Sequence, residues 1–211
     1  MATLTTLLDD MRDQLNDAAD AKYSVANKTR YINRGQKAMY PKVYQIVQDA
    51  TLVWVADQYE YVVPSALDEG TILNIEAETT ASSSDFVKLD GRVFDIVANA
   101  SYGNTLTLKN TNAFPTPVGA SIRFTAALPL TELVNAGDTY SGPAVTDALP
   151  VLYAMAIATS RDIEARLNYY RFSTTQALNG TEIEDFSGTA TFWMDQFNRE
   201  LDQLKMAMPN P

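Results

Sequence analysis

The sequence predicts an α+β fold, in which a helical bundle with two N-terminal and two C-terminal helices carries an inserted antiparallel β-barrel or sandwich module. Three observations support this prediction. Apolar residues recur with a helical period toward both ends of the chain, the period changes to two in the middle third, and a nearly unbroken apolar stretch begins at Leu149. The expected divisions are 1–50 for the N-terminal helices, 51–127 for the β module, 128–146 for a linker, and 147–211 for the C-terminal helices and tail.

Residues 147–170 are expected to form the central helix of the bundle. Thr146 or Asp147 can cap its first amides, and Pro150 falls in the first turn, where a missing amide hydrogen loses no helical bond. Residues 149–157 are apolar on nearly every side, and a helix without a polar face is usually buried all round. The remainder is amphipathic, so one end should lie in a core and the other should reach a surface.

Two helices are predicted before the β module. Residues 3–18 should form an amphipathic helix whose apolar face contains Leu4, Leu8, Met11 and Leu15. A second helix should begin after Ser24, a capping residue, and its apolar positions continue as far as Ile46. Pro41 lies inside that pattern and predicts a kink or a break, while Gly35 in mid-helix predicts a close crossing with another helix.

Alternating apolar residues from Thr51 onward predict the first strands of the β module. Residues 51–55 and 59–63 are expected to pair as a hairpin, and residues 72–78 form a third strand. The polar residues 79–85 then predict an exposed loop.

The clearest local signal is the phrase FVKLDGRVFDIV, in which Asp90 and Gly91 are a typical type I′ turn pair between two strands. A two-residue turn would place on one face the apolar side chains Val87, Leu89, Phe94 and Ile96. After a further turn at residues 101–104, this inner face would continue with Leu106, Leu108, Ile122 and Phe124. Six or seven antiparallel strands are therefore expected, as a small barrel or sandwich.

Ser187 is expected to cap the last helix, whose apolar stripe contains Ala190, Trp193, Phe197, Leu201, Leu204 and Met208. The acidic residues 182–185 precede it and are expected to lie in a solvated loop, because no histidine and no calcium-loop spacing accompanies them.

The end of the chain is a candidate assembly element. The stripe continues almost to the terminus, methionine side chains suit an adaptable contact surface, and the final prolines leave an extended tail. The predicted partner-docking residues are Leu201, Leu204, Met206, Met208, Pro209, Asn210 and Pro211. The alternative is that this helix completes the core of the chain and the tail frays.

The composition argues against an enzyme. The chain has no histidine and no cysteine, which removes the commonest general base, metal ligands and thiol nucleophile. No nucleotide-binding glycine loop or nucleophile elbow occurs, so no catalytic, metal or cofactor residues are predicted, and no cofactor. The formal net charge of −10 predicts weak binding to DNA, and no apolar run is long enough to cross a membrane.

Several phrases together resemble the head–tail connector proteins of tailed bacteriophages. They are LTTLLDDMRDQLND, then SVANKTRYINRGQKAMY with Tyr31, Ile32 and Asn33, YEYVVP ending at Pro64, IRFTAALPLTEL, and ALPVLYAMAIA with Leu149, Pro150 and Tyr153. The large β module is more similar to the tail-tubular or gatekeeper type than to the shortest adaptors. The phrases span most of the chain.

This resemblance implies a structural virion protein at the neck, assembled in the host cytoplasm. It implies a homo-oligomeric ring of about a dozen subunits, with the portal and a tail or stopper protein as partners. DNA would pass through its lumen without specific binding, and C-terminal residues would dock on the portal.

Two other functions stay open from the sequence. A glycan-binding or capsid decoration protein would use the β module, with Trp54, Tyr59, Tyr61 or Tyr102 stacking on sugars from an exposed face. A hydrolase would need distant acids to meet in a cleft, although no pair is singled out.

Overall fold

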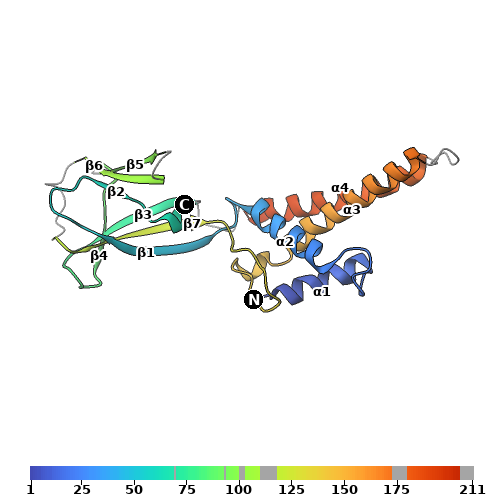
Figure 1. Cartoon of the computed structure of the whole chain (residues 1–211), viewed down its shortest axis with the longest axis horizontal. Helices are drawn as coiled ribbons and strands as arrows, with labels where there is room; N and C mark the ends of the chain where they lie inside the picture. Colours follow the sequence, from blue (N-terminus) through green and yellow to red (C-terminus); the bar gives the residue numbers. More distant parts are fainter. Residues whose placement is uncertain (69, 93, 100–102, 110–117, 173–179, 205–211) are drawn as a thin grey trace. The chain divides into compact units, whose positions relative to one another are not determined.

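The computed structural model describes residues 1–68, 70–92, 94–99, 103–109, 118–172 and 180–204. The chain forms two compact units, a helical unit of Met1–Tyr44 with Leu130–Asn210, and a β unit of Gln45–Pro129 (Figure 1). The predicted α+β fold, with strands inserted between two pairs of helices, is confirmed.

Within the described ranges, the helical unit contains α1 (Leu4–Leu15), α2 (Val25–Met39), the 3₁₀ helix η3 (Ala144–Thr146), α3 (Leu149–Phe172) and α4 (Gly180–Leu204). The capping hydroxyl of Thr3 accepts a hydrogen bond from the amide of Thr6 at the start of α1, and that of Ser24 accepts from Asn27 at the start of α2. The predicted cap at Ser24 is thus confirmed.

The second helix ends earlier than its apolar pattern predicts. Helix α2 stops at Met39, and strand β1 already begins at Gln45, so the predicted continuation to Ile46 and the division at residue 50 are wrong. Pro41 explains the end, because proline has no amide hydrogen to donate and disfavours the helical conformation at the residue before it. Of the two expected effects of Pro41, the break is confirmed.

Helix α3 packs against α1, α2 and α4, as the central position predicted for it requires. Its first half is buried, including the small residues Ala154, Ala156 and Ala158. A Cβ atom at Gly35 of α2 would lie under 3 Å from backbone atoms of Pro150, so the predicted close helix crossing is confirmed. Small residues on α3 and a glycine on α2 therefore let these helices approach closely.

Both C-terminal helices begin differently from the prediction. The amides of Val151 and Leu152 donate to the carbonyl oxygen of Ala148, whereas the hydroxyl of Thr146 donates to Pro143, so Thr146 does not cap α3. Helix α4 begins at Gly180, which places Ser187 and the acidic residues 182–185 inside the helix rather than at its cap and in a loop. Acidic residues near a helix N-terminus are favoured by the helix dipole.

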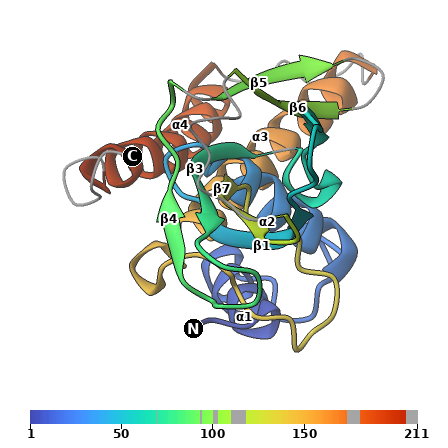
Figure 2. The ribbon, with the colours of Figure 1, turned by 90° about the vertical axis from the view of Figure 1, so that its left-hand side faces the viewer.

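The β unit contains two antiparallel sheets among its described residues (Figure 2). One has the order β1-β7-β3-β4, from strands Gln45–Val53, Ser121–Leu128, Thr71–Glu78 and Phe86–Lys88. The other has the order β2-β6-β5, from strands Glu60–Val62, Gly103–Leu108 and Phe94–Asn99, and the 3₁₀ helix η1 spans Ser65–Leu67. Neither sheet closes on itself, so the sandwich alternative is correct and the barrel is not.

Two of the local hairpins predicted from the sequence, residues 51–55 with 59–63 and the pair joined by Asp90 and Gly91, are wrong. Strand β1 pairs with β7 while β2 pairs with β6, and β4 pairs with β3 while β5 pairs with β6. The Asp90 carboxylate accepts a hydrogen bond from the amide of Arg92 at 2.9 Å, and neither Asp90 nor Gly91 has a positive φ. The segment is therefore an Asx-type turn between strands of different sheets, not a type I′ hairpin turn.

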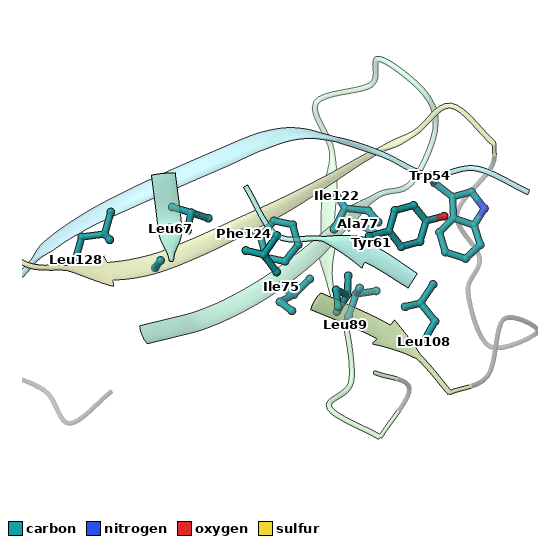
Figure 3. Packing of buried hydrophobic residues seen from close by; sticks show 13 residues of the cluster. Trp54, Tyr61, Leu67, Ile75, Ala77, Leu89, Leu108, Ile122, Phe124 and Leu128 are labelled. Atoms are coloured by element: carbon teal, nitrogen blue, oxygen red, sulfur yellow. The ribbon is translucent and has the colours of Figure 1, made fainter. Parts of the chain in front are cut away.

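The other predictions for the β module are confirmed in part. Strands β5 and β6 pair as the expected hairpin, with Phe94 opposite Leu108. Figure 3 shows the apolar side chains of both sheets meeting in one core, with the Trp54 and Tyr61 rings stacked at one end. Ile122 and Phe124 are buried there as predicted, but Val87 is 52% exposed, so its predicted inward position is wrong. Gln45 and Leu128 are paired at the ends of β1 and β7.

Candidate functional site

The residues that the structure describes contain no evident cluster of side chains suited to catalysis or metal binding. No group of three or more acidic side chains within those ranges is placed to hold a metal ion. Helices long and apolar enough to span a membrane are also not found among the residues searched. The distinctive features are two surfaces of opposite charge on the helical unit and a buried ion network between α1 and α2.

The exposed face of α2 is basic in an acidic chain. The fifteen residues of α2 include four lysines or arginines and no aspartate or glutamate. Three of these cations, Arg30, Arg34 and Lys37, are exposed and spaced by four and three residues, which places them on one side of the helix. Sequence reasoning overlooked this face because the net charge of the whole chain is −10.

A groove of about 760 Å³ runs along this basic face. It lies between α2 and residues 132–134, and it is called the basic groove below. Its lining residues are Val25, Ala26, Thr29, Arg30, Asn33, Arg34, Lys37, Glu132, Leu133 and Val134. Because all of them belong to the helical unit, its shape does not depend on the β unit.

Asn33 fixes the wall of the groove. Its side-chain nitrogen donates to the carbonyl oxygen of Leu133 at 2.9 Å, and its side-chain oxygen accepts from the amide of Leu133 at 3.0 Å. A single side chain thus satisfies both backbone groups of a residue a hundred positions away. The exposed Lys37 adds an ion pair with Glu132, of small value by itself.

Other side chains that line the groove are exposed. Arg30 donates to the side-chain oxygen of Asn27 at 2.9 Å, and within the described part of the chain Arg34 takes part in no ion pair. Val25 and Val134 are 42% and 72% exposed. Exposed apolar side chains beside unpaired cations are features of a contact surface for an acidic partner.

Acidic side chains gather on another face of the same unit. Asp10 and Asp13 are exposed on α1, and the pKa of Asp10 is raised, first because burial removes part of its water and then because of the negative charges of Asp147, Asp13 and Asp9. Asp147 lies two residues before the start of α3, the helix that packs against α1. Asp10, Asp13 and Asp147, with the neighbouring Val145, are called the acidic face below.

A buried ion network holds the connection between α1 and α2. Lys28 is fully buried, and its ammonium group lies 2.9 Å from Asp17 Oδ2 and 2.7 Å from Asp20 Oδ1. Arg12 donates from two nitrogens to the two carboxylate oxygens of Asp20, at 2.9 and 2.8 Å. Asp17 also accepts from the amide of Tyr23, so each carboxylate has several donors.

These contacts set the acidity of the two carboxyl groups. The hydrogen bond from Lys28 is the largest cause that lowers the pKa of Asp17 to about 2, and the amide of Lys22 adds to it. The hydrogen bonds from Arg12 and then Lys28 hold the pKa of Asp20 well below its ordinary range. These ion pairs join the segment between α1 and α2 to both helices, so the role of the network is structural.

The residues that carry the resemblance to head–tail connectors lie mostly in the interior. Tyr31, Ile32, Leu149 and Pro150 are buried, and Tyr153 packs edge-to-face on Phe197, with ring centroids 5.2 Å apart. Pro64 directly precedes η1. Their positions are explained by packing, and only Asn33 contributes to the groove.

The predicted docking residues are divided by the structure. Leu201 is 4% exposed and belongs to the core formed with Met39 and Phe197, a position that favours the alternative in which this helix completes the core of the chain. Leu204 is half-buried and packs against that core. The other predicted docking residues, Met206, Met208, Pro209, Asn210 and Pro211, lie outside the described residues.

Two of the four aromatic residues predicted for glycan binding lie in the core. Trp54 and Tyr61 are buried, and the hydroxyl of Tyr61 donates to the carbonyl oxygen of Val55 at 3.0 Å. Tyr59 is exposed, and Tyr102 lies outside the described residues. Trp54 and Tyr61 therefore serve the core of the β unit.

Neither a protein-family model nor a curated protein matches the sequence.

Proposed function

We propose that this chain is a structural subunit of a bacteriophage neck ring, which joins the portal to the tail or to the next neck protein. The observation that carries the proposal is the order of the two units. A β sandwich of residues 45–129 interrupts a helical unit between its second and third helices, as the resemblance to head–tail connectors implies. This function requires contacts and a conduit rather than catalysis.

Separate surfaces of opposite charge support a role in assembly. A subunit inside a ring contacts two lateral neighbours and the proteins above and below it, so it needs several independent contact surfaces. The helical unit presents the basic groove and the acidic face, and the β unit has exposed valines on two strands of one sheet, Val62 and Val97. Exposed apolar side chains of this kind are covered when subunits assemble.

The charge of the chain suits a conduit for DNA. Residues 45–129 carry ten aspartates or glutamates and only four lysines or arginines. Because unpaired acidic groups repel phosphates, DNA would pass such a subunit without adhering to it. The proposed partners are copies of this chain, the portal, a tail or stopper protein, and DNA as passing cargo, all within the virion neck.

Size measurement of the assembled species tests the proposal. The purified chain, alone and with the portal protein of its own phage, is examined by native mass spectrometry and electron microscopy. We expect a closed ring of about a dozen subunits, either free or seated on the portal. A chain that remains monomeric or trimeric under both conditions and instead binds glycans would contradict the proposal and favour a decoration protein.

A further inference from the structure

We infer that the basic groove on one copy of this chain receives the acidic face of the next copy, so that neighbouring subunits contact one another head-to-tail. The inference rests on the proposed ring and names the lateral interface within it. The groove contributes Arg30, Arg34, Val25 and Val134, and the acidic face contributes Asp10, Asp13, Asp147 and Val145.

The charges of the two faces are complementary and largely unused within one chain. Arg34 forms no ion pair in the part of the chain that the structure describes, and neither does Asp10 or Asp13. Asp9 is excluded from the contact because it already pairs with Arg12 at 2.6 Å. Opposite charges across an interface accelerate encounter and select the correct partner.

Each face also exposes an apolar side chain that a contact would cover. Val145 is 79% exposed, two residues before Asp147, and on the other face Val25 and Val134 are exposed as well. Exposed ion pairs contribute little individually, so a stable contact requires apolar burial in addition to charge. The combination of apolar and charged groups on both faces supplies both requirements.

The distribution of charge favours a head-to-tail contact over a self-paired one. A self-paired contact centred on either one of these faces would place Arg34 near Arg34, or Asp10 near Asp10. A head-to-tail contact places opposite charges together, and it closes into a ring when the rotation between copies allows. Nucleic acid is a weaker candidate for the groove, because Lys37 is already neutralised by Glu132.

Charge reversal tests the contact. Variants Arg34→Glu and Asp10→Lys each place like charges opposite one another at every interface, so each alone should associate about tenfold or more weakly than the unaltered chain. An equal mixture of the two should recover association. At one kind of contact the reversed position 34 faces the reversed position 10, and at the other the unaltered Arg34 faces the unaltered Asp10, so opposite charges meet at both. The matched control is Arg92→Glu, an exposed cation in the β unit, which should change nothing.

Cross-linking locates the contact directly, because the chain has no cysteine of its own. Ala26→Cys marks the groove and Gln14→Cys marks the exposed side of α1, and both positions are exposed. Mild oxidation of the mixed variants should give a disulfide-linked dimer, whereas either variant alone should give little. Circular dichroism of every variant establishes that loss of association does not result from unfolding.

The outcomes separate the inference from the proposed function. Rings that form equally well with Arg34→Glu, or the absence of the Ala26–Gln14 cross-link, overturn the inference and leave the ring proposal standing. A cross-link that forms as expected, with chains that never close into a ring, supports the head-to-tail contact and contradicts the proposed ring. Cross-linking of Ala26→Cys to itself would instead indicate a self-paired contact and overturn the inference.

Discussion

A Cβ atom at Gly35 would lie 2.8 Å from the carbonyl oxygen of Pro150 and 2.9 Å from its Cα atom, so the crossing of α2 and α3 leaves no room for a side chain. The neighbouring atoms belong to the backbone and cannot rotate away. A glycine that lowers helix propensity is therefore retained at a position where close packing requires it.

The variant Gly35→Ala is expected to lower the free energy of unfolding by about 1–2 kcal/mol, because overpacking costs more than the gain in helix propensity. Gly188→Ala is the matched control, since Gly188 lies inside α4 and its Cβ would meet nothing within 4 Å. That control should gain about 0.5–1 kcal/mol. Urea denaturation measures both, and equal stabilisation by the two variants would contradict the tight crossing.

Lys28→Met is expected to lower the free energy of unfolding by about 3 kcal/mol, because it leaves the carboxylates of Asp17 and Asp20 without their buried cation. Lys22→Met is the control. Lys22 also pairs with an aspartate, Asp162, but its side chain is half exposed, so the loss should be below about 1 kcal/mol. Thermal unfolding followed by circular dichroism compares the two, and similar losses would show that the network contributes little.

Asp17 should make the helical unit sensitive to acid. Its pKa is lowered from 3.8 to about 2, so its stabilising contribution is present above about pH 4 and is lost as the pH falls to about 2. Asp17→Asn removes this contribution at every pH. The difference in stability between the natural chain and the variant should therefore shrink over that window, and a constant difference would show that ionised Asp17 is not the cause.

Leu201→Ala is expected to lower the free energy of unfolding by about 2–5 kcal/mol, because Leu201 fills the core shared by α2, α3 and α4. Leu204→Ala should cost less, since Leu204 is only half-buried. Equilibrium denaturation gives both values. A Leu201→Ala chain of unchanged stability that fails to assemble would support the docking role predicted from the sequence.

Periodicity predicted the kinds of elements well, and failed where pairing depends on distant residues. The change from helical to alternating pattern identified the β unit, yet the Asp90–Gly91 pair did not reveal that β4 and β5 belong to different sheets. A local turn signal describes four residues, whereas sheet membership depends on which strands share a core. The helix boundary at Pro41 was open to prediction, because proline ends a helix for purely local reasons.

The buried ion network was missed for a different reason. Lys28 lies on the same face of α2 as the buried residues Tyr31, Ile32 and Met39. The helical spacing alone therefore indicates a buried lysine, which requires a partner of opposite charge. Its partners Asp17 and Asp20 lie in a connection, where spacing carries no geometric information. The basic groove was equally hidden, since its second wall comes from residues 132–134, far away in the chain.

The pairing of Gln45 with Leu128 places the entrance and the exit of the β unit side by side. Paired residues in neighbouring antiparallel strands have Cα atoms only about 5 Å apart, which is the gap that a tight turn spans. The sandwich is thus connected to the helical unit by two neighbouring chain segments, one entering β1 and one leaving β7. Removal of the strands between these two residues would therefore leave chain ends close enough to be joined by a short turn, with the chain path through the helices unbroken.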